Sequence, residues 1–192
     1  MKQIVLATSN PNKLREINEI ASSFGVQFES APEGFNPEEN GKTFEENAYI
    51  KASEAAKLTG KIALADDTGL CVEALNGEPG IYSARFAKTQ EEKISKMLSL
   101  LKNVPKEKRS AFFICSMVIV NPKGETLFSS VGKINGMIDT KPAGVNGFGY
   151  DPIFFIPSEN KTMAELTEKE KNTISHRALA LKDVLNYIIH NA

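Results

Sequence analysis

The stretch "QIVLATSNPNKLREI" (Gln3–Ile17) passes from a strand pattern to a helix pattern within a few residues. The apolar run Gln3–Ala7 predicts a short buried strand. Asn10 is a favoured helix N-cap, and Pro11 suits the first helical position, where its missing N–H has no partner to lose. The apolar spacing that follows predicts an amphipathic helix ending at Gly25, with a buried face made of Leu14, Ile17, Ile20, Ala21 and Phe24. This opening is typical of an α/β fold.

Further strands and helices follow without strict alternation. A helix is predicted from Thr43 to Gly60, because Thr43 and Glu46 have capping-box spacing. The acidic segment 31–42, rich in Pro and Gly, predicts an exposed loop. The other predicted elements are strands Val26–Glu29 and Ile62–Ala65, helix Gln90–Lys102, a hairpin of strands Phe112–Val120 and Glu125–Ile134, strand Ile153–Ile156, and a helix over 175–189 with Ser175 as N-cap. We therefore expect one α/β domain, residues 1–192, around a mixed sheet and without an independent linker.

Composition limits the possible partners. The 192 residues are 41% hydrophobic and 24% charged, which fits one globular domain or two small lobes sharing a core. The net charge of −1 gives no overall basic field for nucleic acid or an anionic membrane. Cys71 and Cys115 cannot build a disulfide scaffold, and the apolar run in "MKQIVLATSN" is too short for a signal peptide. We expect a cytoplasmic protein that binds neither nucleic acid nor membrane.

Lys13 lies in the first turn of the first predicted helix. A positive charge there opposes the helix dipole, at a cost of about 0.3–1 kcal/mol. An anion bound at the helix start would remove that cost. A solvated surface lysine is equally compatible with the sequence, and the segment lacks the G-x-x-x-x-G-K-[ST] phosphate-loop pattern.

The stretch "ALADDTGL" (Ala63–Leu70) places Asp66 and Asp67 at the end of an apolar strand. Ligands of α/β proteins collect at strand ends. Adjacent side chains of an extended chain point to opposite sides, so one carboxylate can face a cleft. Carboxylates there suit Mg²⁺, which binds through one or two carboxylates together with substrate phosphates. The alternative is a simple turn, since Asp-Thr-Gly is common turn composition.

Two further segments offer side chains for a planar, oxygen-bearing ligand. "NGFGYD" (Asn146–Asp151) lacks the glycine order of a dinucleotide fingerprint, but Phe148 and Tyr150 could lie against a base. The alternative is a buried hairpin loop whose aromatic rings belong to the core. His176 and Arg177 bring cations to the first turn of the last helix, where surface side chains are the alternative. Two helix starts with the same unfavourable charge favour a shared anionic or carbonyl-bearing ligand.

Taken in order, these segments resemble the inosine triphosphate pyrophosphatase family, enzymes that remove non-standard purine nucleoside triphosphates. The resemblance covers nearly the whole chain and rests on "TSNPNK", "TFEENAYIKA", "LADDTGL", "PGIYSARFA", "GFGYDPIF" and "SHRALAL". Ser9 stands where Gly is common in bacterial members, and Thr68 where Ser is common. Both residues keep a small or hydroxyl-bearing side chain, so the activity is expected to persist.

The resemblance implies an elongated α/β fold with two lobes around a long mixed sheet, flanking helices, and an active site in the cleft between the lobes. It also implies a homodimer and Mg²⁺-dependent hydrolysis of ITP, dITP and XTP to the monophosphate and pyrophosphate. Two alternatives stay open. One is a related pyrophosphatase for modified or pyrimidine nucleotides, and the other is a nucleotide-binding sensor that does not hydrolyse its ligand.

The resemblance also implies roles for individual residues. Asp67 is the candidate base for the attacking water, and Glu39 and Asp67 are the metal carboxylates. Arg177 can only donate hydrogen bonds, so it matches the 6-oxo group of hypoxanthine or xanthine and mispairs with the 6-amino group of adenine. The implied contacts of the triphosphate are Thr8, Ser9, Asn10, Pro11, Asn12, Lys13 and Lys51. Thr68 is also implied to contact the substrate. The base and sugar are implied to contact Phe148, Gly149, Tyr150 and Asp151, and Lys171, His176 and Arg177 to close over the base.

Overall fold

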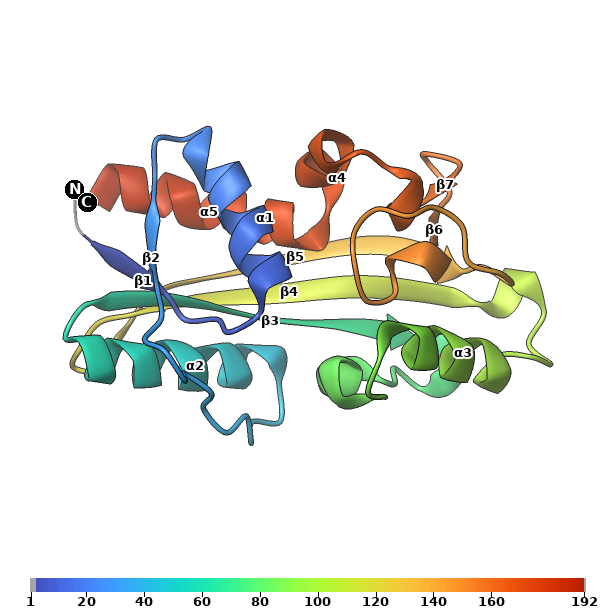
Figure 1. Ribbon diagram of the computed structural model, residues 1–192, viewed down its shortest axis with the longest axis horizontal. Coiled ribbons are helices and arrows are strands. Elements are labelled where there is room, and N and C mark those ends of the chain that lie inside the picture. Colours follow the sequence, from blue (N-terminus) through green and yellow to red (C-terminus); the bar gives the residue numbers. More distant parts are fainter. Residues whose placement is uncertain (1–2, 192) are drawn as a thin grey trace. The chain divides into compact units, whose positions relative to one another are not determined.

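A computed structural model describes residues 3–191. Its strands form one seven-stranded sheet in the order β2-β1-β3-β4-β5-β6-β7 (Figure 1). β1 pairs in parallel with β2 and β3, whereas β6 pairs antiparallel with β5 and β7. The strands are β1 (Ile4–Leu6), β2 (Phe28–Ser30), β3 (Ile62–Val72), β4 (Ser110–Val120), β5 (Thr126–Ile138), β6 (Phe154–Ile156) and β7 (Lys161–Thr162). The predicted α/β fold around a mixed sheet is confirmed.

The α-helices lie in the connections that run from β1 to β4 and in the segment that follows β7. They are α1 (Pro11–Ser22), α2 (Phe44–Thr59), α3 (Gln90–Leu100), α4 (Glu168–Ile174) and α5 (His176–Asn191). Short 3-10 turns occupy Glu73–Leu75, Gly80–Arg85, Lys106–Lys108, Asp151–Ile153 and Met163–Glu165. Within residues 3–191, no helix combines the length and apolar character that a membrane crossing requires.

The chain divides into two compact units. The first contains the described residues of Met1–Thr68 and His176–Ala192 together with Cys115–Gly132, and the second contains Gly69–Ile114 and Lys133–Ser175. β3, β4 and β5 each contribute residues to both units. A single domain spanning 1–192, with an active site between two lobes, stays a prediction.

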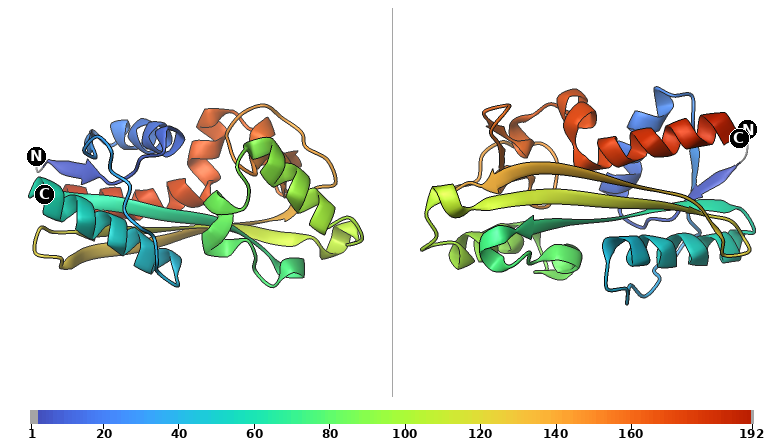
Figure 2. Two further views of the ribbon diagram at one scale, coloured as in Figure 1. Left: turned by 60° about the horizontal axis from the view of Figure 1, so that its bottom comes forward. Right: turned by 180° about the vertical axis from the view of Figure 1, so that it is seen from behind.

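The first unit has three layers, with a sheet between helices. α1 and α5 cover one face of its strands and α2 covers the other (Figures 1 and 2). Side chains alternate accordingly along the strands: Leu6 and Leu64 pack in the cluster with α1 and α5, whereas Val5 and Ala65 pack in the cluster with the alanines of α2. A side chain of β3 is therefore directed either to α2 or to α1 and α5.

The second unit has its own apolar core. Met97 and Leu101 at the end of α3 pack there with Phe113 of β4 and Phe154 of β6. The rings of Phe113 and Phe154 lie 4.6 Å apart between centroids. The helix predicted over Gln90–Lys102 is confirmed, although it ends at Leu100.

α2 begins and ends at the predicted residues. The Thr43 hydroxyl accepts the N–H of Glu46 at 3.1 Å, and Gly60 ends the helix in the left-handed region with a φ of 67°. The Glu46 carboxylate reaches back to the N–H of Lys42 at 2.6 Å, one residue earlier than in a standard capping box. The predicted exposed loop before α2 is also confirmed.

Several other sequence-based boundaries were wrong as well. The second strand is Phe28–Ser30, two residues later at its start than predicted, and Phe24 lies beyond the end of α1 with 37% of its surface exposed. More important for function, β3 does not end at Ala65 but continues to Val72. Asp66 and Asp67 therefore lie inside a strand and not at its end or in a turn.

Gly132 marks a close contact between β5 and the start of α5. A Cβ atom at this position would lie 2.0 Å from the carbonyl oxygen of His176 and 2.6 Å from the amide nitrogen of Ala180. Both atoms belong to the backbone, so neither can move aside alone. The absence of a side chain at Gly132 therefore places the first turn of α5, which carries His176 and Arg177.

We expect Gly132→Ala to lower the free energy of unfolding by about 1–3 kcal/mol, because the first turn of α5 must shift to admit the methyl group. Urea denaturation followed by circular dichroism measures the change. Ser129→Ala, at an exposed position of the same strand, is the control and should leave stability unchanged. Equal urea concentrations at the midpoint of unfolding for Gly132→Ala and the unmodified chain would contradict the close contact.

Candidate active site

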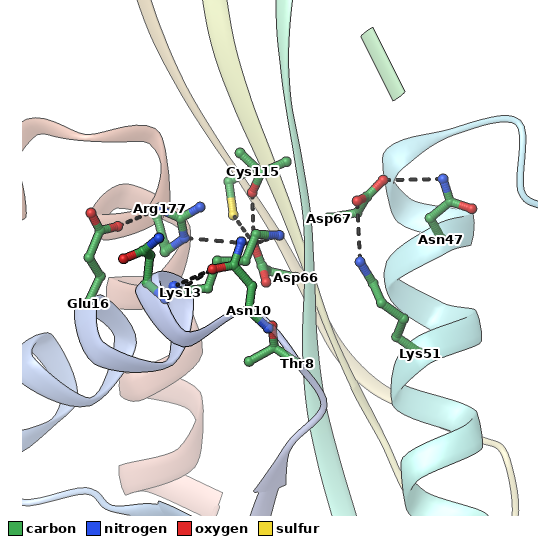
Figure 3. A network of polar contacts seen from close by, with 12 residues as sticks. Thr8, Asn10, Lys13, Glu16, Asn47, Lys51, Asp66, Asp67, Cys115 and Arg177 are labelled. Atoms are coloured by element: carbon green, nitrogen blue, oxygen red, sulfur yellow. Dashed lines mark hydrogen bonds and ion pairs between the residues drawn. The ribbon is translucent and has the colours of Figure 1, made fainter. Parts of the chain in front are cut away.

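Asp66 and Asp67 are neighbouring buried carboxylates on opposite sides of β3 (Figure 3). Asp66 faces α1 and α5, whereas Asp67 faces α2. The strand alternation predicted from the sequence is therefore confirmed. Because both carboxylates are removed from water, each needs its own positive or hydrogen-bonding partners.

On the first side, Asp66 is surrounded by donors from distant parts of the chain. Its Oδ2 lies 2.8 Å from the Lys13 ammonium and 3.7 Å from Nε of Arg177, and it accepts the Thr68 hydroxyl at 2.8 Å. Burial alone would raise the pKa of Asp66, but the Lys13 and Arg177 charges outweigh it and hold that pKa well below its usual range. Asp66 is thus a permanent anion.

Arg177 is buried rather than solvated. Its Nη1 lies 2.5 Å from Glu16 Oε2, and only 2% of its surface is exposed. His176 is also buried, so the surface alternative for both residues is wrong. The sequence reasoning missed Glu16, which is buried on the inner face of α1. Its i,i+3 spacing from Lys13 was the available signal.

The predicted phosphate-binding segment Thr8–Lys13 already satisfies part of its own backbone. Asn10 Oδ1 accepts the N–H groups of Asn12 and Lys13 at 3.0 and 3.4 Å, as the N-cap prediction requires. The segment therefore presents mainly side chains to any ligand. Its first residues border a cavity of about 440 Å³ lined by Thr8, Ser9, Ala31, Pro32, Gly34, Phe35 and Asn36.

On the second side, Asp67 joins two other predicted site residues. Its Oδ1 lies 3.3 Å from the Lys51 ammonium, which is 2.9 Å from Glu39 Oε1. Asp67 Oδ2 also accepts a hydrogen bond of 3.2 Å from the amide of Asn47. Lys51 and Asn47 are one helical turn apart on α2, so this helix supplies both partners of the carboxylate.

Burial shapes the charges of this second cluster. Burial, only partly offset by the Lys51 ammonium, raises the pKa of the Asp67 carboxyl. Burial also works against the charge of Lys51, but Asp67, Asp66 and Glu39 together raise its pKa above the usual value. Lys51 is therefore a lasting cation, and Asp67 is a better proton acceptor than an ordinary carboxylate.

The donor set of Glu39 and Asp67 fits a magnesium ion. Within residues 3–191, no group of three or more His, Cys, Asp or Glu side chains gathers as a metal site. Mg²⁺ does not need one, because it binds through one or two carboxylates and completes its shell with water and phosphate. Glu39 and Asp67 already share one cation, the Lys51 ammonium.

The second unit gathers three more predicted residues. The Asp151 carboxylate lies 2.8 Å from the Lys171 ammonium and accepts the N–H of Phe148 at 2.9 Å. The same ammonium lies 4.9 Å from the centre of the Phe148 ring. Tyr150 is instead buried and donates its hydroxyl to the Ser83 carbonyl, so its ring belongs to the core, and burial raises its pKa.

The structure thus arranges the predicted residues in separate clusters. Lys13 and Arg177 meet at Asp66, Glu39 and Lys51 meet at Asp67, and Lys171 meets Asp151. The carboxylates at the centre of the first two clusters belong to consecutive residues of β3. The Lys13 charge on one face therefore still opposes the rise in the pKa of Asp67 that burial causes on the other. Their convergence with the second unit on one ligand stays a prediction.

Comparison with known proteins gives consistent matches over nearly the full chain. A model of the Ham1 family matches residues 4–187. The chain is 48% identical over 192 residues to the dITP/XTP pyrophosphatase of Yersinia pseudotuberculosis serotype I, covering 97% of this chain and 98% of that protein. It is 48% identical over 188 residues to the dITP/XTP pyrophosphatase of Bacillus subtilis (strain 168), covering 95% of this chain and 94% of the relative.

A solved structure agrees with the sequence matches. The structure of a HAM1 protein from Coxiella burnetii superposes with a TM-score of 0.89 at 42% identity, over 99% of this chain and 100% of that one. These matches confirm the resemblance inferred from the motifs. The chain belongs to the Ham1 family.

Proposed function

We infer that this chain is a hydrolase that converts non-standard purine nucleoside triphosphates, such as ITP, dITP and XTP, to the monophosphate and pyrophosphate. The observation that carries this conclusion is the cluster of Asp67, Lys51 and Glu39. In it, the proton-accepting carboxylate of Asp67 lies beside the fixed positive charge of Lys51. The dITP/XTP pyrophosphatases that share 48% of the sequence support the substrate class. A sensor that only held its ligand would not require a buried carboxylate acting as base.

We propose Mg²⁺ as the cofactor, held by Glu39 and Asp67. When bound, the ion neutralises charge that gathers on the departing phosphate oxygens. A triphosphate carries roughly four negative charges, so cations from the protein are needed beside the metal. Lys13 and Lys51 supply them from the first turn of α1 and the middle of α2.

The chemical step follows from the position of Asp67. Water attacks the α-phosphorus, a new P–O bond forms, and the bond to the oxygen bridging the α- and β-phosphorus breaks, so pyrophosphate leaves. Asp67 accepts the proton of that water, and the Lys51 ammonium holds one of its oxygens in place. Lys51 is the fixed positive charge beside it, and burial keeps bulk water from screening both.

Base recognition is proposed to rest on Arg177, with Phe148, Asp151, Lys171 and His176 around the base and sugar. Arg177 carries only donors, which match a 6-oxo group and mispair with a 6-amino group. Its orientation is fixed by Glu16, so the guanidinium need not be ordered when the ligand arrives. Guanine also carries a 6-oxo group and must be rejected by another contact.

Two broader expectations accompany the activity. We propose that the enzyme is a homodimer, which the family resemblance supports and size-exclusion chromatography with light scattering can test. We also propose that it acts in the cytoplasm, where its substrates would be found. The two buried, unbridged thiols of Cys71 and Cys115 are compatible with a reducing compartment.

Pyrophosphate release tests the substrate class and the metal together. We expect turnover of dITP and XTP with Mg²⁺, loss of turnover after chelation, and recovery when Mg²⁺ is restored. dATP and dTTP should be turned over far more slowly. Equal rates for dATP and dITP would reject purine discrimination, and a preference for dTTP would favour the pyrimidine-directed alternative.

We expect Asp67→Asn to reduce kcat for dITP by about 10²–10⁴-fold, because the amide cannot accept the proton from water. The side chain keeps its size, so nucleotide binding measured by calorimetry should be largely retained. Glu54→Gln, which neutralises an exposed carboxylate of α2, is the matched control. A near-normal kcat for Asp67→Asn would show that another group is the base.

Arg177→Lys tests recognition of the base while keeping the positive charge beside Asp66 and Glu16. We expect the ratio of kcat/KM for dITP over dATP to fall by at least about tenfold, because lysine lacks the planar fork of donors. The unmodified chain is assayed in parallel with both substrates. An unchanged ratio would assign discrimination to a different residue.

A further inference from the structure

Asn47 is a fully buried amide beside Asp67 that no role above explains. None of its surface is exposed, and both ends of the amide have partners. Its Nδ2 donates to Asp67 Oδ2 at 3.2 Å, and its Oδ1 accepts the N–H of Gly41 at 2.9 Å (Figure 3 shows the first of these). Because an ionised carboxylate can only accept and a backbone N–H can only donate, the orientation of the amide is fixed.

Gly41 belongs to the loop that carries Glu39, and this loop touches α2 more closely than a side chain would allow. A Cβ atom at Gly41 would lie 2.7 Å from Asn47 Oδ1, 2.8 Å from Glu46 Cβ and 3.0 Å from the Asn47 backbone nitrogen. Gly41 therefore permits the approach, and the Asn47 amide holds it. Glu39 lies only two residues away from this point.

Glu39 and Asp67 are thus linked in two different ways. The Lys51 ammonium joins them by charge, at 2.9 and 3.3 Å, from the end of a long side chain. The Asn47 amide joins Asp67 to the Glu39 loop by two directional hydrogen bonds from a short side chain. The second link is the one that can fix orientation, because hydrogen bonds weaken steeply when their angle changes.

We propose that Asn47 is a positioning residue, which aims the Asp67 carboxylate and fixes the Glu39 loop against it so that both carboxylates face one metal and one water. This inference rests on the proposed pyrophosphatase function. It assigns Asn47 no contact with substrate. It requires a side chain that donates at one end and accepts at the other within the length of asparagine. Aspartate would set a second carboxylate against Asp67. Alanine would remove the hydrogen bonds that Asn47 makes with Asp67 Oδ2 and with the Gly41 N–H.

The experiment compares Asn47→Ala and Gly41→Ala with the unmodified chain in pyrophosphate release from dITP over a range of Mg²⁺ concentrations. We expect kcat to fall by about 10–100-fold and the Mg²⁺ concentration for half-maximal rate to rise about tenfold, as for other residues that orient metal ligands. KM for dITP should change little. Calorimetric titration with Mg²⁺ alone should show weaker binding by both variants.

Two comparisons separate positioning from folding. Gly41→Ala keeps the Asn47 side chain, but its added methyl group displaces the loop that carries Glu39. Asn47→Ala removes the amide itself. Both variants should therefore weaken Mg²⁺ binding. Glu54→Ala, at an exposed position of α2, is the matched control and should keep kcat and metal dependence. Thermal unfolding of each variant confirms that the assays report folded protein.

The outcomes are distinct for the function and for Asn47. If the unmodified chain releases no pyrophosphate from dITP, the proposed function fails and the inference fails with it. If the unmodified chain is active and Asn47→Ala keeps its kcat, its metal dependence and its Mg²⁺ affinity, the inference alone is overturned. Loss of stability with unchanged kinetics in folded protein would likewise reduce Asn47 to a packing role.

Discussion

Two adjacent carboxylates inside one strand are the constraint on which the first unit depends. Asp66 and Asp67 are both buried in β3, and strand geometry sends them to opposite faces of the sheet. Burying an unpaired carboxylate is strongly unfavourable, so each face must supply compensating charge. Lys13 and Arg177 do so on one face and Lys51 does so on the other. The placement of α1, α2 and α5 satisfies both requirements at once.

The two carboxylates differ in chemistry although they differ by one position in sequence. Asp66 has the Lys13 and Arg177 cations around it, so its pKa is low and it serves as a fixed anion. Asp67 has one ammonium and an amide, and burial leaves its pKa raised. The different surroundings thus give the two residues different roles. Asp66 is a fixed charge that holds cations in place, and Asp67 is a carboxylate suited to accept a proton. In our account, this division lets one strand hold phosphate-binding and catalytic groups together.

Local features of the fold were predictable from sequence, whereas features that depend on distant partners were not. Asn10 and Thr43 were identified as helix caps because capping involves only the next few residues. The end of β3 was misplaced because "DDTG" has turn composition, while the neighbouring strand β4 comes from a later part of the chain. The surface alternative for Arg177 stayed open for the same reason, since its partner Glu16 is 161 positions away.

In the candidate site, too, residue types could be predicted from the sequence, whereas contacts between distant residues could not. Residue identities in the motifs indicated Glu39, Lys51 and Asp67, and the structure brings these three together. Nothing in the spacing of Asn47 revealed its bond to Asp67, because that contact needs the register of α2 against β3. Alternation along β3 places the predicted residues of the first unit in clusters on two faces of the sheet. Their convergence on one ligand stays a prediction.

The most direct test of this account is a crystal structure of the chain with Mn²⁺ and a non-hydrolysable dITP analogue, in which anomalous scattering locates the metal. The account predicts the anomalous peak within ligand distance of Glu39 and Asp67, on the α2 face of β3, with phosphate oxygens completing the shell. A peak beside Asp66 on the α1 and α5 face, or a nucleotide bound without contact to either lysine, would contradict it.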